Sequence, residues 1–280
     1  MRREPFGPTG VAVPVVGQGT WNMERDGRAA AVAALRAGLD LGMTHIDTAE
    51  MYGSGRVEEL VGEAIAGRRE QVFLVSKVLP QNASRTGVLR ACEASLRRLR
   101  TDRLDCYLLH WPGRHPLADT IAAFEQLRRE GKVRAWGVSN FGVEEMERAA
   151  AIAGAERIAC DQVLYHLEER TIEHAVIPWC VTRGIAVVGY SPFGSGRFPG
   201  PRSRGGRVLA EIAAAHGATA REVALAFLVR APGLFTISKA GRAAHVAENA
   251  GAGDLALSAE DVRRIDAAFP PGRWRGLPML

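Results

Sequence analysis

Four side chains that together could transfer a proton stand at or just beyond the ends of apolar, β-prone runs. Asp47, Lys77 and His110 each end such a run, and Tyr52 follows shortly after the first of them. A tyrosine keeps its proton up to about pH 10, and a neighbouring ammonium stabilises the phenolate and so lowers the pKa. Lys77 would supply this ammonium, Asp47 would keep it charged, and His110 would hydrogen-bond a substrate oxygen. We therefore expect a proton donor beside an oxyanion site.

The elements that must bring these residues together alternate along the chain. Strand-like runs are separated by amphipathic segments typical of helices, such as 89–99 and 120–130, and several runs are continuously apolar, as in parallel strands buried on both faces. The eight runs cover residues 16–20, 44–48, 72–78, 104–110, 135–139, 159–164, 186–190 and 235–238. This alternation predicts an α/β fold, a (β/α)8 TIM barrel, in which the carboxyl ends of the strands carry the site.

Two additions to the barrel are predicted at its ends. Residues 6–13 are typical of a small N-terminal β-hairpin, and Ser258 with the acids after it indicates an extra C-terminal helix before a short tail at 270–280. Irregular loops follow two predicted strand ends, at 111–115 and 193–206, and the glycine- and proline-rich second loop is expected to act as a flap. We find no linker, so residues 1–280 are expected to form a single domain.

The composition is that of an ordinary globular protein. Hydrophobic residues make up 47% of the 280 residues and charged residues 24%, which is enough for a sizeable core. The net charge of +5 is spread over helix faces, which favours an anionic ligand over nucleic acid. No run approaches the roughly 20 apolar residues of a membrane span, and glycine and proline interrupt the start of the chain where a secretory signal would be apolar. We expect a cytoplasmic monomer with no membrane or nucleic-acid partner.

Nothing in the sequence indicates a metal site. The four cysteines form no CxxC pair, and the seven histidines show no HExxH or comparable spacing. We expect the cysteines, Cys92, Cys106, Cys160 and Cys180, to be reduced and to pack as small apolar groups. The glycine pairs at 53–55 and 194–196 lack the phosphate-loop pattern and are interpreted as turns.

The four side chains and their flanking residues resemble, in order, the catalytic tetrad of the aldo-keto reductases. The matching segments are Gly17–Trp21, His45–Ala49 with Tyr52–Gly53, Ser76–Lys77 and Leu109–Pro112, and the resemblance covers essentially the whole chain. It implies that Tyr52 is the general acid, that Lys77 and Asp47 tune it, and that His110 positions the substrate carbonyl. It also implies a nicotinamide cofactor that carries the hydride.

The resemblance assigns further residues to the nicotinamide and the substrate. Ser139, Asn140 and Gln162 would hydrogen-bond the carboxamide, and Tyr190 would stack on the ring. Cofactor contacts are also implied for Gly19, Thr20, Trp21, Asp47, Ser191, Pro192 and Phe193. Trp21 and Trp111, together with Tyr52 and His110, would contact the substrate.

Residues 237–249 are similar to the adenosine-phosphate motif of the same family, with departures. The usual proline is Ser238, the usual serine is Ala240 and the usual arginine is His245, so two common contacts to the 2′-phosphate are altered. Lys239 is retained, and Arg242 lies near a helix start, where phosphate is favoured. The residues implied to bind are Ile237, Ser238, Lys239, Ala240, Arg242, His245, Glu248 and Asn249. We expect NADPH, with NADH as the alternative.

The function implied is reduction of aldehydes and ketones to alcohols by an NADPH-dependent oxidoreductase. The loop after His110 and the C-terminal tail are short, which favours small carbonyls or dicarbonyls such as methylglyoxal over large substrates. Two alternatives stay open. The chain could be an NADPH-binding sensor with little turnover, or a Schiff-base lyase with Lys77 as nucleophile, although a charge-pairing Asp47 argues against the lyase.

Overall fold

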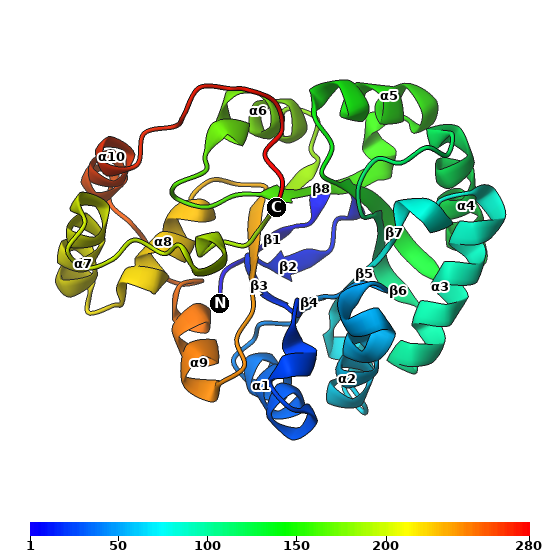
Figure 1. Cartoon of the computed structure of the whole chain (residues 1–280), viewed down its shortest axis with the longest axis horizontal. Coiled ribbons are helices and arrows are strands. Elements are labelled where there is room, and N and C mark those ends of the chain that lie inside the picture. The colour runs from blue at the N-terminus through cyan, green and yellow to red at the C-terminus, as the bar shows by residue number, and fades with distance from the viewer.

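Eight parallel strands pair edge to edge into a closed barrel that helices surround (Figure 1). The strands of this computed structural model, which describes residues 1–280, are β3 (Val16–Gly19), β4 (His45–Asp47), β5 (Phe73–Val78), β6 (Leu104–Leu109), β7 (Val133–Ser139), β8 (Ile158–Leu164), β9 (Ala186–Tyr190) and β10 (Leu234–Ser238). Pairing of β10 with β3 closes the barrel. The predicted (β/α)8 barrel is confirmed, and each predicted strand coincides with an observed one to within two residues.

The helices lie outside the barrel. They are α1 (Arg28–Asp40), α2 (Arg56–Ala64), α3 (Arg85–Leu99), α4 (Leu117–Arg129), α5 (Val143–Ala153), α6 (Val176–Val181), α7 (Arg204–His216), α8 (Ala220–Leu228), α9 (Ala243–Gly251) and α10 (Ala259–Ala268). Two of them begin earlier than the apolar periodicity predicts. The helix expected from residue 89 begins at Arg85 because Ser84 caps it by accepting a hydrogen bond from the Gly87 amide, and the helix expected from residue 120 begins at Leu117.

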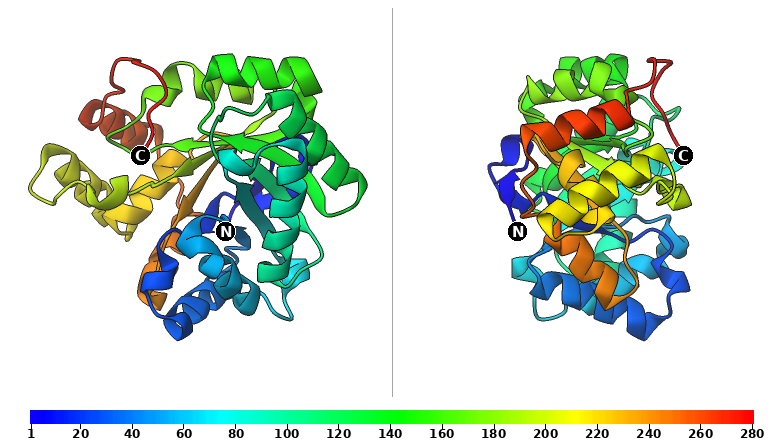
Figure 2. Two further views of the ribbon diagram at one scale, coloured as in Figure 1. Left: turned by 45° about the vertical axis from the view of Figure 1, so that its right-hand side comes forward. Right: turned by 90° about the vertical axis from the view of Figure 1, so that its left-hand side faces the viewer.

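The N-terminal hairpin closes the end of the barrel opposite the carboxyl ends of the strands. Its strands, β1 (Arg3–Pro5) and β2 (Ala12–Pro14), pair antiparallel, so the predicted hairpin is present. It begins before the predicted residues 6–13, because residues 6–11 form the connection between its strands. Phe6 from the connecting loop is fully buried, with ring centroids 4.7 Å from Phe73 and 5.1 Å from Phe235. Figure 2 shows the hairpin and the end of the C-terminal tail on opposite sides of the barrel.

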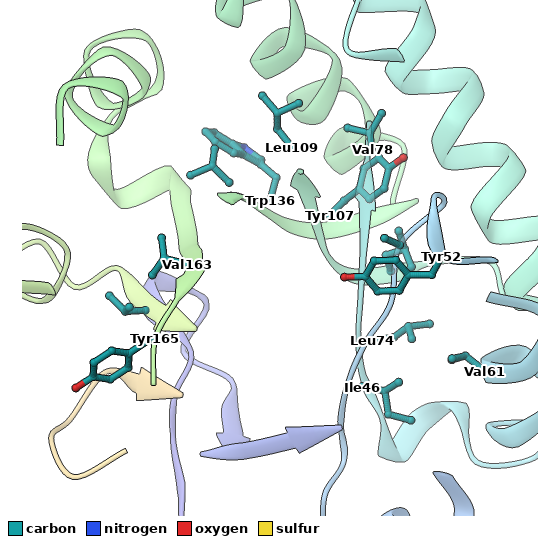
Figure 3. Packing of buried hydrophobic residues seen from close by; sticks show 14 of the residues in the cluster. Ile46, Tyr52, Val61, Leu74, Val78, Tyr107, Leu109, Trp136, Val163 and Tyr165 are labelled. Atoms are coloured by element: carbon teal, nitrogen blue, oxygen red, sulfur yellow. The ribbon is translucent and has the colours of Figure 1, made fainter. Parts of the chain in front are cut away.

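Apolar side chains fill two layers, one inside the barrel and one between the strands and the helices. Figure 3 shows part of the outer layer, in which Ile46 and Leu74 from neighbouring strands belong to the same cluster as Val61 of α2. Inside the barrel, glycine provides room for larger neighbours: a β-carbon at Gly17 would lie 2.9 Å from the ring of His45. This packing makes the strands a rigid base for the residues at their carboxyl ends.

The C-terminal elements largely follow expectation. Ser258 caps α10 in a reciprocal arrangement with Asp261, which confirms the extra helix, and residues 270–280 contain no helix or strand. The loop predicted at 193–206 ends earlier, because Ser203 caps α7 and residues 204–206 are helical. No helix has the length and apolar character that crossing a membrane requires.

Candidate active site

Lys77 is the centre of a buried polar cluster at the carboxyl ends of the strands. Its Nζ atom donates to Asp47 Oδ1 at 2.5 Å, to the Thr48 carbonyl at 2.8 Å and to the Tyr52 hydroxyl at 3.2 Å. Lys77 and Asp47 are both 0% exposed. The three donors of the ammonium are therefore all engaged, and one of them holds the phenol oxygen.

Tyr52 reaches this cluster from a short 3-10 turn, Tyr52–Gly55, that follows β4. The turn contains Ser54 in the left-handed region, at φ 55°, a conformation that a non-glycine residue adopts at a cost. The Tyr52 ring packs edge-on against Trp21 at 4.9 Å and lies 5.8 Å from the ring of His110. The four residues of the predicted tetrad are thus brought together.

Asp47 and Lys77 form a buried salt bridge. Burial raises the pKa of Asp47 and outweighs the opposing effect of Lys77 and Gln162. Burial alone would lower the pKa of Lys77, but Asp47 and Tyr52 together raise it. Both charges are therefore compensated inside the barrel, and the ammonium keeps its proton.

The pKa of Tyr52 differs from the sequence-based expectation. Burial raises it, and Asp47 adds to this effect, so the opposing pull of Lys77 does not lower the pKa as expected. Burial, together with Lys77, lowers the pKa of His110 to about 2, so its imidazole is neutral. At neutral pH Tyr52 thus holds a proton that it can donate, whereas His110 offers hydrogen bonds without charge.

The residues predicted to meet a carboxamide form a second network that is joined to the first. Gln162 Nε2 donates to Asp47 Oδ2 at 2.8 Å, and Ser139 Oγ donates to the Gln162 carbonyl at 2.8 Å. Asn140, at φ 59°, donates to the His110 carbonyl at 3.1 Å and accepts from the Tyr190 hydroxyl at 2.9 Å. Asn140 also donates to Ser139 Oγ at 3.2 Å, so one hydrogen-bonded system runs from Lys77 to Tyr190 across the strand ends.

Other predicted residues surround this network on the loops. Trp21 is 49% exposed, and the ring of Trp111 lies 4.8 Å from that of His110. The segment Ser191–Phe193 follows β9, and Arg221 of α8 stacks over the Phe193 ring at 5.1 Å. Thr20, next to Gly19 at the end of β3, donates to the Asp47 carbonyl at 2.8 Å. These contacts hold the loops next to the tetrad.

The tail also reaches the carboxyl ends of the strands. Burial raises the pKa of Tyr190 to about 12, and the backbone of Leu280 has the opposite effect. Figure 2 shows the chain ending on this side of the barrel.

The predicted adenosine-phosphate residues lie apart from the tetrad, on the connection from β10 into α9. Ile237, Ser238, Ala240 and Asn249 are buried, Glu248 is half-buried, and Lys239, Arg242 and His245 are exposed. The N-cap of α9 makes no side-chain capping bond, and the first turn of the helix has no acid. Its free amides and the nearby cations are suited to a phosphate group.

One residue of this region was missed by sequence reasoning. Asp26, on the loop between β3 and α1, forms an ion pair with Lys239. No motif surrounds Asp26, and 213 positions separate it from its partner, so only the three-dimensional structure shows the contact.

The cysteines and the residues that could bind a metal form no further reactive site. All four cysteines are free and buried. No group of three or more histidine, cysteine, aspartate or glutamate side chains is arranged to hold a metal ion.

Comparison with known proteins gives consistent similarities. The model of the Aldo/keto reductase family matches residues 15–269. Methylglyoxal reductase YeaE of Escherichia coli (strain K12) is 47% identical over 263 residues, covering 93% of this chain and 92% of that protein. Glyoxal reductase of Bacillus subtilis (strain 168) is 34% identical over 261 residues, covering 92% and 90%. A crystal structure of an aldo/keto reductase from Klebsiella pneumoniae with NADP and acetate is 44% identical, with a TM-score of 0.93 over 100% of both chains.

Proposed function

This chain belongs to the aldo/keto reductase family, and from that premise we propose that it is an NADPH-dependent reductase of small carbonyl compounds with Tyr52 as the proton donor. The observation that carries the proposal is the buried contact of the Tyr52 hydroxyl with Lys77, itself paired with Asp47. Reduction of a carbonyl needs a proton for the developing alkoxide. A tyrosine with a raised pKa and an adjacent ammonium supplies that proton and stabilises the phenolate that remains.

The residues of the tetrad divide the work. Tyr52 donates its proton to the carbonyl oxygen, and the positive charge of Lys77 offsets the negative charge left on the phenol oxygen. Asp47 fixes the ammonium through Oδ1 and holds Gln162 through Oδ2. His110, neutral because of its low pKa, donates a hydrogen bond that orients the substrate oxygen.

The remaining residues fit a nicotinamide dinucleotide. Gln162 uses Nε2 for Asp47, which leaves Oε1 to accept from a carboxamide, and Asn140 Oδ1 has a second lone pair beyond its bond with Tyr190. Tyr190 would stack on the ring, while Lys239, Arg242 and the open end of α9 would hold the 2′-phosphate. When bound, NADPH supplies the hydride.

The substrate class we propose is small aldehydes and dicarbonyls, with methylglyoxal as the test compound. Two relatives named as methylglyoxal and glyoxal reductases support this choice. Trp21 and Trp111 beside Tyr52 and His110 would provide apolar walls around a small carbonyl.

The structure does not favour the Schiff-base alternative. A nucleophilic lysine needs a lowered pKa and a free lone pair. The pKa of Lys77 is raised, and its ammonium donates to three oxygen atoms. Lys77 is therefore suited to hold charge and unsuited to attack a carbonyl.

The direct test is oxidation of NADPH, followed by its absorbance, with methylglyoxal and a panel of aldehydes, alongside NADH. We expect turnover with NADPH and alcohol as product. Tight NADPH binding without turnover on any carbonyl would refute the reductase and leave a cofactor sensor. An adduct trapped by borohydride in the absence of cofactor would instead support the lyase.

We also propose that the protein acts as a cytoplasmic monomer. The four free cysteines fit a reducing compartment. Light scattering of the purified chain should give a mass near 30.2 kDa, and twice that mass would contradict the proposal.

A further inference from the structure

The ion pair between Lys239 and Asp26 places a carboxylate next to the lysine to which the proposed function assigns the 2′-phosphate. The two residues come from loops that follow different strands, β10 and β3. Their side chains are 32% and 24% exposed, so the pair is accessible to a ligand but only partly solvated. A second anion at Lys239 would therefore lie close to the carboxylate of Asp26.

The loop after β10 is shaped around this carboxylate. A β-carbon on Gly241 would lie 2.5 Å from Asp26 Oδ2 and 2.6 Å from its carboxyl carbon, closer than real contacts allow. The φ of Gly241 is not in the left-handed region, so its backbone conformation does not require glycine. A side chain at residue 241 would therefore require the carboxylate of Asp26 to move.

Asp26 has no other partner that would explain its position. Its buried Oδ2 atom contacts no donor except the Lys239 ammonium. Its backbone amide already bonds within its own turn, to the Met23 carbonyl, so the loop does not need the side chain to hold its shape. The pairing with Lys239 is therefore the contact that explains where the carboxylate lies.

The charges at this site would affect the binding of NADPH and of NADH differently. A 2′-phosphate carries nearly two negative charges and would share Lys239 with the carboxylate, so Asp26 opposes it. A ribose 2′-hydroxyl is neutral and can donate a hydrogen bond to a carboxylate, which is how an acidic residue accepts NADH in other dinucleotide sites. His245, where the resemblance predicts arginine, adds no permanent positive charge to offset Asp26.

We propose that Asp26 is a specificity-determining residue that weakens binding of the 2′-phosphate and thereby brings the affinities for NADPH and NADH closer together. The inference rests on the proposed function, because it assumes that the adenosine end of the cofactor lies at Lys239. It assigns to Asp26 no part in the chemical step.

The test separates the adenosine end from the rest of the cofactor. Calorimetric titration of the full chain with 2′,5′-ADP and with 5′-ADP measures the contribution of the 2′-phosphate alone. For Asp26→Asn we expect 2′,5′-ADP to bind about 5- to 30-fold more tightly, as removal of a like charge at a half-exposed site predicts. The affinity for 5′-ADP should change by less than about 3-fold, since the lost interaction is one hydrogen bond to a neutral group.

Two further variants make the result specific. Asp40→Asn removes the same charge from another surface ion pair, that with Arg68, and should leave both affinities unchanged. Asp26→Ala removes the carboxylate without adding an amide and should tighten 2′,5′-ADP in the same direction. Thermal unfolding of each variant confirms that it is folded.

The outcomes are distinguishable. Asp26→Asn could change the affinities for both nucleotides equally or change neither. Either result would overturn the inference and leave the ion pair as a structural contact between two loops. Equal tightening in Asp40→Asn would also overturn it, as an effect of net charge. A wild-type chain that binds NADPH and reduces methylglyoxal but shows either result would refute only the role of Asp26, whereas a chain that binds neither dinucleotide would refute the proposed function itself.

Discussion

The tetrad and the Lys239 site are both built around a lysine paired with an aspartate, but they differ in what surrounds the pair. Lys77 and Asp47 are fully buried, and Asp47 also accepts from Gln162. Lys239 and Asp26 are partly exposed, and the buried oxygen of Asp26 has no other partner. The first pair is fixed by strands that pack against each other, whereas the second joins two loops.

This difference indicates that the residues of the tetrad must keep their positions, whereas residues at the Lys239 site can be substituted. A buried charge without its partner is costly, so Asp47, Lys77 and Gln162 depend on one another. An exposed pair contributes little to stability, so residues near Lys239 can change with small effect on the fold. The departures from the family pattern at Ser238, Ala240 and His245 flank Lys239, and of these three residues His245 is exposed whereas Ser238 and Ala240 are buried.

Removal of the Tyr52 hydroxyl from the tetrad should have the largest effect of the changes considered at the two sites. Tyr52→Phe deletes the proposed proton donor and should lower the turnover number for methylglyoxal by about 100- to 10,000-fold, the range for loss of a general acid. The affinity for NADPH, measured by fluorescence titration, should change by less than about 3-fold, because the hydroxyl contacts Lys77 and not the proposed cofactor residues.

Tyr107→Phe is the matched control, because Tyr107 is also buried and its hydroxyl has no hydrogen-bond partner. Its turnover should equal that of the wild type. A Tyr52→Phe protein with more than a tenth of wild-type turnover would show that another group donates the proton.

The two ion pairs should differ in their contribution to folding. Asp47→Asn leaves the Lys77 ammonium buried without a counter-charge and should lower the free energy of unfolding by about 3–5 kcal/mol. Lys239→Met should lower it by less than about 1 kcal/mol, as for an exposed pair. Urea denaturation at pH 7 measures both, and similar losses in the two variants would contradict the distinction between a buried and a replaceable pair.

A smaller effect on stability is expected from Asp161, a buried carboxyl group that is not paired with a cation. Asp161 is 0% exposed, Oδ2 has no partner, and burial raises the pKa well above 3.8. Because the folded state holds the proton more tightly than the unfolded state, unfolding becomes easier as pH rises from about 4 toward the folded pKa. Asp161→Asn removes this dependence and should be more stable than the wild type at pH 8 by about 1.4 kcal/mol for each unit of pKa difference.

Asp261→Asn provides a control of opposite sign. Hydrogen bonds from Ser258, against a weak burial effect, lower the pKa of Asp261 to about 2. Its stabilisation is present above the unfolded pKa near 3.8 and is lost as pH falls toward 2, so this variant should be less stable than the wild type at pH 8. Thermal unfolding at pH 5 and pH 8 measures both variants, and a wild-type chain that is no less stable than Asp161→Asn at pH 8 would contradict the destabilising effect expected from the raised pKa of Asp161.

Much of the fold follows from local patterns. The alternation of strand-like runs with amphipathic segments located all eight strands, and the strand ends placed Lys77 and His110 at one end of the barrel. Helix starts were less certain, because α3 begins where Ser84 can cap it and not where the apolar periodicity begins. The residues of the tetrad were identified from their types and their places at or just beyond strand ends, whereas the residues of the carboxamide network were assigned through the resemblance to the aldo-keto reductases.

By itself, then, the sequence determined which residues could meet, because a parallel barrel gathers the carboxyl ends of its strands whatever the loops do. Only the tertiary structure decided how those residues behave. The pKa of Tyr52 is raised where proximity to Lys77 predicted a lower value, since burial depends on every neighbour that excludes water. The partner of Lys239 was likewise hidden, because an ion pair between two irregular loops has no periodicity that a sequence could display.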